Sequence, residues 1–234
     1  MINRIAKKLY SFITNEYKYL KPEIKCNSKW YGNSYGGFYI NPDFINSDSI
    51  IYSFGIGEDI SFDETVIKEH NATIYAFDPT PKSIEWLKNN ISSDKFIFHK
   101  YGLSNKTGKM DFYLPKNEDH VSGSLVMQTV VDEERKISVN MKSIRDIIKD
   151  LKHDRIDILK MDIEGAEYDV IDDILSVDIP IAQILIEFHS RFFASGTEMT
   201  KNTIQKLREN GYIIYAVSKS KQEVSFINKN LITQ

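Results

Sequence analysis

Residues 50–59 read Ile-Ile-Tyr-Ser-Phe-Gly-Ile-Gly-Glu-Asp, and they set the architecture that we expect for this chain. The first five residues are mostly apolar, which is typical of a short strand buried on both faces. Gly55 and Gly57 follow immediately. A residue without a Cβ lets the backbone turn tightly and approach a ligand closely. The stretch therefore predicts a buried strand that ends in a ligand-binding loop.

Similar strands recur along the chain, and helical patterns stand between them. Further core strands are expected at 73–77, 95–99, 156–161 and 181–188, with helices at 60–70, 81–90, 143–151, 166–175 and 198–210. Strands at 212–217 and 223–227 close the chain, and two more are expected at 109–114 and 136–141. Apolar strands that alternate with helices favour a parallel sheet covered on both faces. The predicted fold class is α/β, a Rossmann-like doubly wound sheet, mostly parallel, with an antiparallel C-terminal edge.

The length of 234 residues fits one α/β domain, expected at 49–234, with an extension at 1–48. Residues 3–20 have the pattern of an amphipathic helix, which either packs on the domain or contacts a membrane surface or a partner. Residues 29–39 are rich in aromatic side chains and glycine, so we expect no regular element there. This segment is either a lid that closes over a ligand or a plain connector.

Composition narrows the class of partner and the compartment. The net charge of -3 argues against a nucleic-acid binder that works through bulk charge. Cys26 is the single cysteine, which excludes an intrachain disulfide and fits a reducing compartment. The sequence contains no apolar run of the length that a membrane crossing needs, and no secretory core. We expect a cytoplasmic protein without a transmembrane segment, and the oligomeric state is not indicated.

A second feature identifies the ligand of the glycine loop as an adenosine-bearing cofactor. The strand at 73–77 runs into Asp78 and Pro79, and an acid about twenty residues beyond the glycines can accept both hydroxyls of a ribose. The alternative is that Asp78 caps the helix that begins near Pro81. A dinucleotide loop needs a third glycine where Ile60 stands, and the Gly-Lys-Ser/Thr of a phosphate loop is also missing. S-adenosylmethionine carries no phosphate, and it fits these residues best.

Acidic side chains follow the next two core strands. Asp162 and Glu164 stand two residues apart where the strand at 156–161 ends, and Glu187 and His189 share a face at the end of the strand at 181–188. Carboxylates placed together at a strand end repel each other and lose hydration, which is typical of a functional site. The alternatives are a solvated helix start for the first pair and a structural Glu-His pair for the second.

The run 157–167, Asp-Ile-Leu-Lys-Met-Asp-Ile-Glu-Gly-Ala-Glu, closely resembles the signature of the FkbM family of methyltransferases. Residues 184–189 resemble the family's next strand, Gly102-Leu103-Ser104 with Gly108 its turn after the third strand, and Ser122-Gly123-Ser124 its small-residue loop. The resemblance covers about residues 50–227. It implies a class I methyltransferase domain that binds S-adenosylmethionine and methylates hydroxyl groups of sugars or natural products. Family motifs map onto Gly55, Gly57, Asp78, Asp162, Glu164, Gly165 and Glu187.

One part of the glycine loop departs from the family pattern. Many members carry Asp-x-Gly-x-Asn-x-Gly there, whereas this chain has Ser53 and, after the glycines, Glu58-Asp59. We expect Glu58 or Asp59 to make the contacts to the methionine part of the cofactor. Pro79, Gly102 and Leu103 are expected to line the adenosine end.

The resemblance suggests a division of roles among the acids. A base that takes the proton of the acceptor hydroxyl assists methyl transfer, and we assign this role to Asp162 or His189. Glu164 and Glu187 then orient a small-molecule or glycan acceptor or hold the base in place. The same four side chains can instead hold a divalent metal, and their spacing does not decide between the two. Two other functions stay open: a non-catalytic scaffold or sensor that binds S-adenosylmethionine, and an NAD-dependent oxidoreductase.

Overall fold

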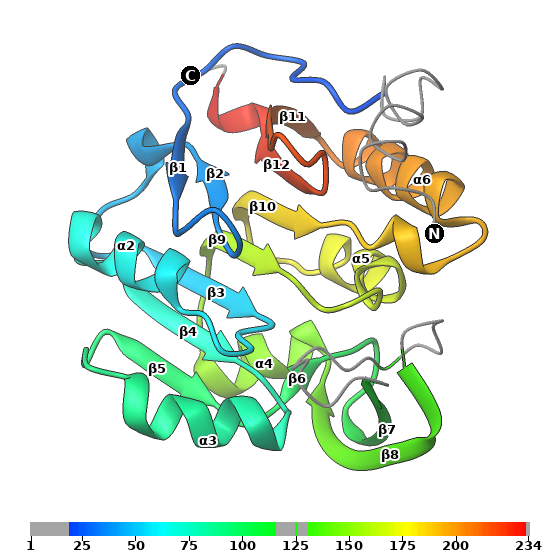
Figure 1. Ribbon diagram of the computed structural model, residues 1–234. Coiled ribbons are helices and arrows are strands. Elements are labelled where there is room, and N and C mark those ends of the chain that lie inside the picture. The colour runs from blue at the N-terminus through cyan, green and yellow to red at the C-terminus, as the bar shows by residue number, and fades with distance from the viewer. Residues whose placement is uncertain (1–18, 116–124, 126–130, 233–234) are drawn as a thin grey trace.

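The structure is a computed structural model, and it describes residues 19–115, 125 and 131–232 (Figure 1). Most of the amphipathic pattern at 3–20, and the Ser122-Gly123-Ser124 loop, lie outside these residues. The helices and strands of the described chain form a layered α/β arrangement around one large sheet. Among the described residues, none of the helices combines the length and the apolar character that a membrane crossing needs.

A sheet of seven strands forms the centre of the molecule, in the order β11-β12-β10-β9-β3-β4-β5. Its strands are β3 (Ile50–Phe54), β4 (Thr73–Phe77), β5 (Phe96–His99), β9 (Ile156–Met161), β10 (Ile181–Glu187), β11 (Tyr212–Val217) and β12 (Glu223–Asn228). The five strands from β5 to β10 pair in parallel, whereas β12 is antiparallel to both β10 and β11. The predicted doubly wound sheet with an antiparallel C-terminal edge is confirmed. The chain order reverses between β3 and β9, which is where such sheets bind ligands.

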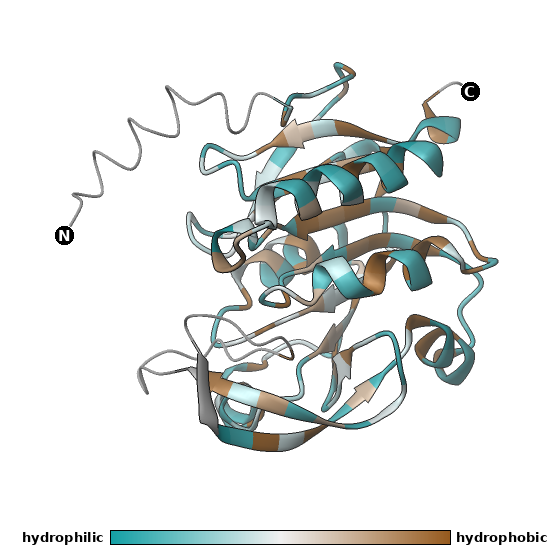
Figure 2. Ribbon diagram, turned by 90° about the vertical axis from the view of Figure 1, so that its right-hand side faces the viewer, coloured by the Kyte–Doolittle hydropathy of each residue, from teal (hydrophilic) through white to brown (hydrophobic). Residues whose placement is uncertain are grey.

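Helices cover both faces of this sheet. They are α2 (Ser61–His70), α3 (Pro81–Asn90), α4 (Ile144–Leu151), α5 (Glu167–Leu175) and α6 (Gly196–Glu209), with short 3₁₀ turns η1 (Pro42–Phe44), η2 (Ser190–Phe192) and η3 (Lys229–Leu231). Residues of α2 and α3 pack into one apolar cluster with the sheet, and residues of α4, α5 and α6 pack into another. Figure 2 shows hydrophobic residues along the strands and hydrophilic ones on the outer faces of the helices. Apolar burial on both faces of the parallel strands therefore holds the layers together.

Local signals explain where several helices begin and end. Pro81 stands in the first turn of α3, where its missing N–H costs no helical hydrogen bond. The Ser143 side chain caps α4 by accepting a hydrogen bond from the backbone N–H of Asp146. Asn71 and Lys152 end α2 and α4 in the left-handed conformation. The expected helix ranges differ from these bounds by no more than two residues.

The aromatic segment is more regular than we expected. Lys29–Tyr31 and Phe38–Ile40 form strands β1 and β2 of an antiparallel hairpin, so the prediction that this segment contains no regular element is wrong for its two arms. Their aromatic side chains pack instead of remaining solvated: Tyr31 and Phe38 are buried, and the rings of Trp30 and Tyr39 meet edge to face at 5.0 Å. Only the tip, residues 32–37, is a loop.

A buried side chain fixes this hairpin to the central sheet. The side chain of Gln183 on β10 accepts a hydrogen bond from the Asn41 backbone N–H and donates one to the Asn41 carbonyl. The hydroxyl of Tyr215 on β11 donates to the same Gln183 oxygen. The hairpin therefore covers the sheet beside α2, and its tip is directed toward the ends of the parallel strands (Figure 1).

The two remaining predicted strands belong to a separate sheet. β6 (Gly102–Leu103), β7 (Gly108–Pro115) and β8 (Val131–Lys142) form three strands in the order β6-β8-β7. β8 begins five residues before the expected range of 136–141 and includes residues outside it at both ends. This sheet extends from the carboxyl end of the central one and lies at its edge (Figure 1).

Candidate active site

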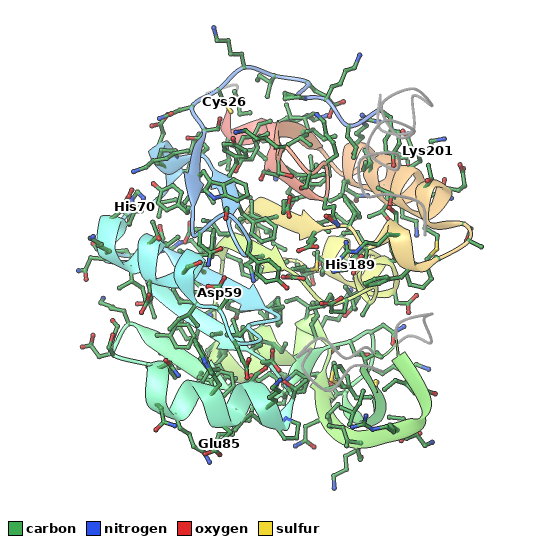
Figure 3. The ribbon with its side chains drawn as sticks, viewed as in Figure 1. Cys26, Asp59, His70, Glu85, His189 and Lys201 are labelled. Carbon is green, nitrogen blue, oxygen red and sulfur yellow. The ribbon has the colours of Figure 1, made fainter. Side chains whose placement is uncertain are left out.

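A cavity of about 940 Å³ lies at the carboxyl ends of β3, β4, β9 and β10. It includes the predicted residues Gly55, Gly57, Glu58, Asp59, Asp78, Pro79, Gly102, Leu103, Asp162, Glu164 and Glu187. His189 and the motif residue Gly165 do not line it. Figure 3 labels Asp59 and His189 near the ends of the central strands. The fold thus brings the predicted cofactor loop and the predicted catalytic acids to one cavity.

The two glycines of the loop are required for different reasons. Gly55 has a φ of +77°, and a Cβ built there would lie 1.6 Å from the carbonyl oxygen of Asp162. The ends of β3 and β9 therefore approach too closely for any side chain at position 55. Gly57 has a φ of +58°, but a Cβ there would meet nothing within 4 Å. Its backbone faces open cavity, so a ligand can approach it closely.

Asp78 holds the glycine loop in place from the end of β4. Its Oδ2 accepts hydrogen bonds of 3.0 Å from the backbone N–H groups of Ile56 and Gly57, and its Oδ1 accepts from the N–H of Thr80. The Thr80 hydroxyl lies within 2.7 Å of both Asp78 Oδ1 and Ser83 Oγ, and its single proton can go to only one of them. When that proton goes to Ser83, Asp78 Oδ1 can accept a ligand hydroxyl. Asp78 does not cap α3, whose N-cap residue is Thr80 without a side-chain cap hydrogen bond, but it orders the turn that precedes this helix.

Asp59 connects the loop to the hairpin. Its Oδ1 accepts from the backbone N–H of Ser61 at the start of α2, and its Oδ2 accepts from the side chain of Asn33 at the hairpin tip. Asp59 and its exposed neighbour Glu58 both line the cavity. Their contact with the methionine part of a cofactor stays a prediction.

Lys160 is a cavity residue to which the sequence assigned no role. It is buried on β9, its Nζ donates to the Gly55 carbonyl at 3.1 Å, and it lies 5.5 Å from the ring centre of Phe38. The lysine therefore holds the glycine loop through the Gly55 carbonyl and contacts the hairpin through the Phe38 ring. A lysine among the apolar residues 158–161 was the signal that could have identified it.

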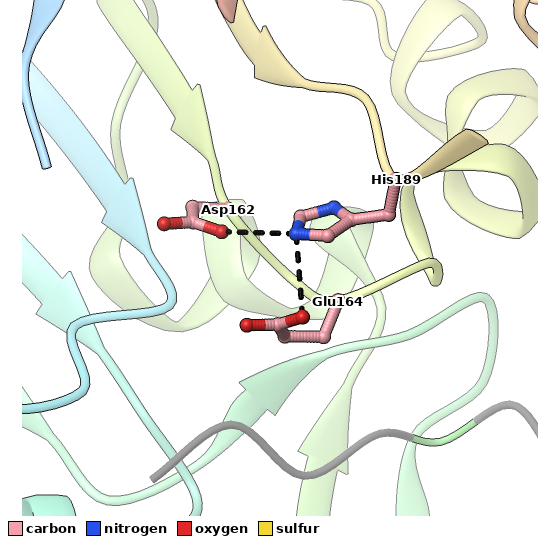
Figure 4. A group of neighbouring side chains, drawn as sticks. All are labelled: Asp162, Glu164 and His189. Atoms are coloured by element: carbon pink, nitrogen blue, oxygen red, sulfur yellow. Dashed lines mark ion pairs between the residues drawn. The ribbon is translucent and has the colours of Figure 1, made fainter. Parts of the chain in front are cut away.

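The acids after β9 and β10 surround one buried imidazole. His189 Nε2 lies 3.6 Å from Asp162 Oδ1, 3.3 Å from Glu164 Oε2 and 3.5 Å from Glu187 Oε1. Figure 4 shows Asp162 and Glu164 converging on this nitrogen. The His189 side chain is only 1% exposed, whereas the three carboxylates are 14–26% exposed. The acids thus reach the cavity, and the histidine lies behind them.

A fourth carboxylate, Glu167 at the start of α5, fixes the other side of the imidazole. Its Oε1 accepts from the backbone N–H of His189 at 2.8 Å and lies 3.3 Å from His189 Nδ1. Its Oε2 accepts from the backbone N–H of Gly165. Glu167 is fully buried. Its position fixes the orientation of the ring, so that Nε2 is directed toward Asp162 and Glu164.

The close packing of charges changes the proton affinities. Burial alone would lower the pKa of His189, but the Glu167 carboxylate, followed by those of Glu164 and Asp162, raises the pKa to about 9. Burial and then the Asp162 carboxylate raise the pKa of Glu187 to about 8, although His189 and Arg191 oppose the change. The guanidinium of Arg191 lies 3.3 Å from Glu187.

The turn between β9 and α5 has an unusual backbone. Glu164 and Gly165 both have positive φ, at +53° and +98°. The left-handed conformation is unfavourable for a glutamate, and such residues persist where the surroundings impose them, often at functional sites. Here the conformation directs the Glu164 carboxylate back toward His189 (Figure 4). The expected role of Gly165, to ease this turn, agrees with its φ.

Several cavity residues lie outside the predicted set. Tyr35 at the hairpin tip lines the cavity and is 82% exposed. Arg191 on η2 and Glu223 on β12 also line the cavity. Glu223 carries no sequence signal, because it reaches the cavity only through the pairing of β12 with β10. Arg191 reaches it on the η2 turn that follows β10. An exposed aromatic at a cavity mouth is a typical contact for a planar or sugar-like ligand.

The strand order, the glycine loop and the shared cavity define a Rossmann-like domain of the S-adenosylmethionine-dependent methyltransferase class. Residues 40–214 match the model of the Methyltransferase FkbM domain, which covers most of the chain. The chain belongs to this family, and the resemblance noted in the sequence is confirmed.

Known proteins similar to the chain are distant. The chain is 23% identical over 146 residues to the human "Probable methyltransferase-like protein 24", a match that covers 62% of this chain and 33% of that protein. The chain thus corresponds to about a third of the length of that relative. Among solved structures, it is 12% identical to Aeropyrum pernix fibrillarin in complex with S-adenosyl-L-methionine, with a TM-score of 0.41 over 89% of this chain and 84% of the other. The fold assignment rests on the strand order and not on this likeness.

Proposed function

We propose that this chain transfers the methyl group of S-adenosylmethionine to a hydroxyl of a small-molecule or glycan acceptor. The observation that carries the proposal is the single cavity, which has the glycine loop at one end and Asp162, Glu164 and Glu187 at the other. A methyl donor and its acceptor have to meet within one enclosed space. The rival functions, a sensor and an oxidoreductase, leave the acid end without a role.

The glycine-loop end suits the cofactor. Asp78 can accept a ribose hydroxyl while it keeps its backbone contacts to the loop, and Gly57 leaves open space beside it. Pro79, Gly102 and Leu103 supply an apolar wall of the kind that an adenine ring needs. Bound S-adenosylmethionine supplies an electrophilic methyl group on a sulfonium sulfur.

The acid end supplies the base. Asp162 and Glu187 line the cavity, so either carboxylate can take the proton of an acceptor hydroxyl. His189 is closed off behind them and acts as a positioning residue. The sequence suggested Asp162 or His189 as the base. We propose Asp162 instead of the enclosed His189, with Glu187 as the alternative base.

The charge of the cavity indicates the class of acceptor. Carboxylates outnumber the cations Lys160 and Arg191 along its wall, which disfavours phosphate or nucleic-acid acceptors. Carboxylates accept hydrogen bonds from neighbouring hydroxyls, and the exposed ring of Tyr35 offers a face on which a sugar can stack. We therefore propose a neutral polyhydroxylated acceptor, a lid role for the hairpin tip, and a cytoplasmic location in keeping with the single cysteine.

The test is transfer of a tritiated methyl group to a panel of sugars, glycosides and polyols, with an RNA as the counter-example. We expect product from hydroxylated acceptors only. Asp162→Asn and Glu187→Gln each remove one of the two candidate bases. The variant that removes the true base is expected to lower kcat about 10²–10⁴-fold. Glu198→Gln on the exposed face of α6 is the matched control and should leave the rate unchanged. Methylation of the RNA, or of amines alone, would contradict the proposal.

A further inference from the structure

The buried His189 has a ring nitrogen that the protein does not satisfy. Its Nε2 makes no hydrogen bond within the part of the chain that the structure describes, although the side chain is only 1% exposed. Three carboxylate oxygens lie within 3.6 Å of this nitrogen, yet none is in line to accept its hydrogen. A buried polar atom without a hydrogen-bond partner is unfavourable, so this nitrogen is a candidate to bind a ligand.

The spacing of the surrounding atoms matches a coordination shell. One ligand atom each from Asp162, Glu164 and His189 lies within 4.8 Å of the other two. Ligands bound at about 2.0–2.2 Å from a metal ion are separated by roughly 3.0–3.6 Å. The distances from His189 Nε2 to Asp162 Oδ1 and Glu164 Oε2 are 3.6 and 3.3 Å. Two of the three separations thus match those of ligands that share one ion.

Groups outside the ligand set already hold these side chains in place. Glu167 lies against the opposite nitrogen, Nδ1, in the carboxylate-histidine arrangement that orients metal-binding imidazoles. The left-handed backbone of Glu164 directs its carboxylate toward the same point. Glu187 differs from the other two acids in pairing with the guanidinium of Arg191.

We propose that Asp162, Glu164 and His189 bind a divalent cation of the Mn²⁺ type, which accepts both carboxylate oxygen and imidazole nitrogen ligands. The inference rests on the proposed function and deepens it. An acceptor hydroxyl bound to this cation loses its proton more readily. The hydroxyl then gives its proton to water in the cavity while its oxygen attacks the methyl carbon of S-adenosylmethionine, and the bond from that carbon to sulfur breaks to leave S-adenosylhomocysteine. Two hydroxyls of a sugar can hold one cation, which agrees with the proposed acceptor class.

The experiment is a titration of the chelator-treated, full-length protein with Mn²⁺, in which electron paramagnetic resonance measures free ion. We expect one ion per chain. Glu164→Gln and Asp162→Asn should each weaken binding at least tenfold, and Glu187→Gln, the matched control, should stay within about threefold of the wild type. Pulsed electron paramagnetic resonance of the wild-type protein with bound Mn²⁺ should show coupling of the ion to one imidazole nitrogen.

Each opposite outcome would overturn the cation site. Absence of bound Mn²⁺ would mean that a proton on His189 alone balances the acids. Binding without nitrogen coupling, or unchanged in Glu164→Gln, would mean adventitious carboxylate binding. The proposed function is tested separately. Undiminished methyl transfer in excess chelator would refute the cation site and support the proposed methyl transfer. Mn²⁺ binding without any methyl transfer would support the cation site and refute the proposed methyl transfer.

Discussion

Substitution of the two loop glycines by alanine separates packing from backbone strain. Both residues have left-handed φ, so each alanine costs about 1–2 kcal/mol of conformational strain. Only Gly55→Ala adds an overlap, because its Cβ would lie 1.6 Å from the Asp162 carbonyl oxygen, less than half a normal contact distance. Forcing β3 and β9 apart to relieve such an overlap costs roughly a further 1–3 kcal/mol. We therefore expect Gly55→Ala to be the less stable variant by that difference.

Thermal unfolding measures this difference directly. For a domain of this size, each kcal/mol corresponds to about 2–4 °C in Tm. Gly55→Ala should therefore melt several degrees below Gly57→Ala, while Gly57→Ala should weaken cofactor binding because its methyl group enters the cavity. Equal melting temperatures for the two variants would refute the close approach of β3 and β9 on which the loop geometry depends.

Three further predictions concern other parts of the structure. Burial, opposed by Lys160, raises the pKa of Asp63 from 3.8 to about 6, so its contribution to stability is full below pH 4 and is lost as the pH rises through 6. Urea unfolding of Asp63→Asn should show an advantage over the wild type that grows by about 2 kcal/mol from pH 4 to pH 8; a constant difference would contradict this. Gln183→Leu leaves the backbone N–H and carbonyl of Asn41 without their buried partner, and should lower the free energy of unfolding by about 2–5 kcal/mol. Tyr35→Ala should change stability by less than about 0.5 kcal/mol but raise the KM of the acceptor; an unchanged KM would remove the lid role.

The sequence predicted the central sheet well because its strands carry a strong local signal. Runs such as 50–54 are apolar almost throughout, and the glycine loop and the acids stand at the carboxyl ends of the core strands, where parallel strands place all such residues together. The cavity that joins Gly57 to Asp162 follows from this rule. It required no knowledge of side-chain packing.

The parts that the sequence did not predict depend on contacts between distant segments. The hairpin is stable because Gln183, more than 140 residues away along the chain, binds Asn41. Glu167 is buried beside His189, from whose backbone N–H it accepts a hydrogen bond, and this contact joins the start of α5 to the end of β10. The same burial removes His189 from the cavity, and no local pattern around it indicates this.

Calorimetric titration of the wild-type protein with S-adenosylhomocysteine, with NAD in parallel, tests the central claim most directly. The cavity next to Gly57 and Asp78 is proposed to hold an adenosine with a short sulfur-linked chain and to lack a pyrophosphate site. We predict micromolar binding of one S-adenosylhomocysteine per chain and no heat with NAD. Binding of NAD, or of neither ligand, would contradict the assignment of this cavity to methyl transfer.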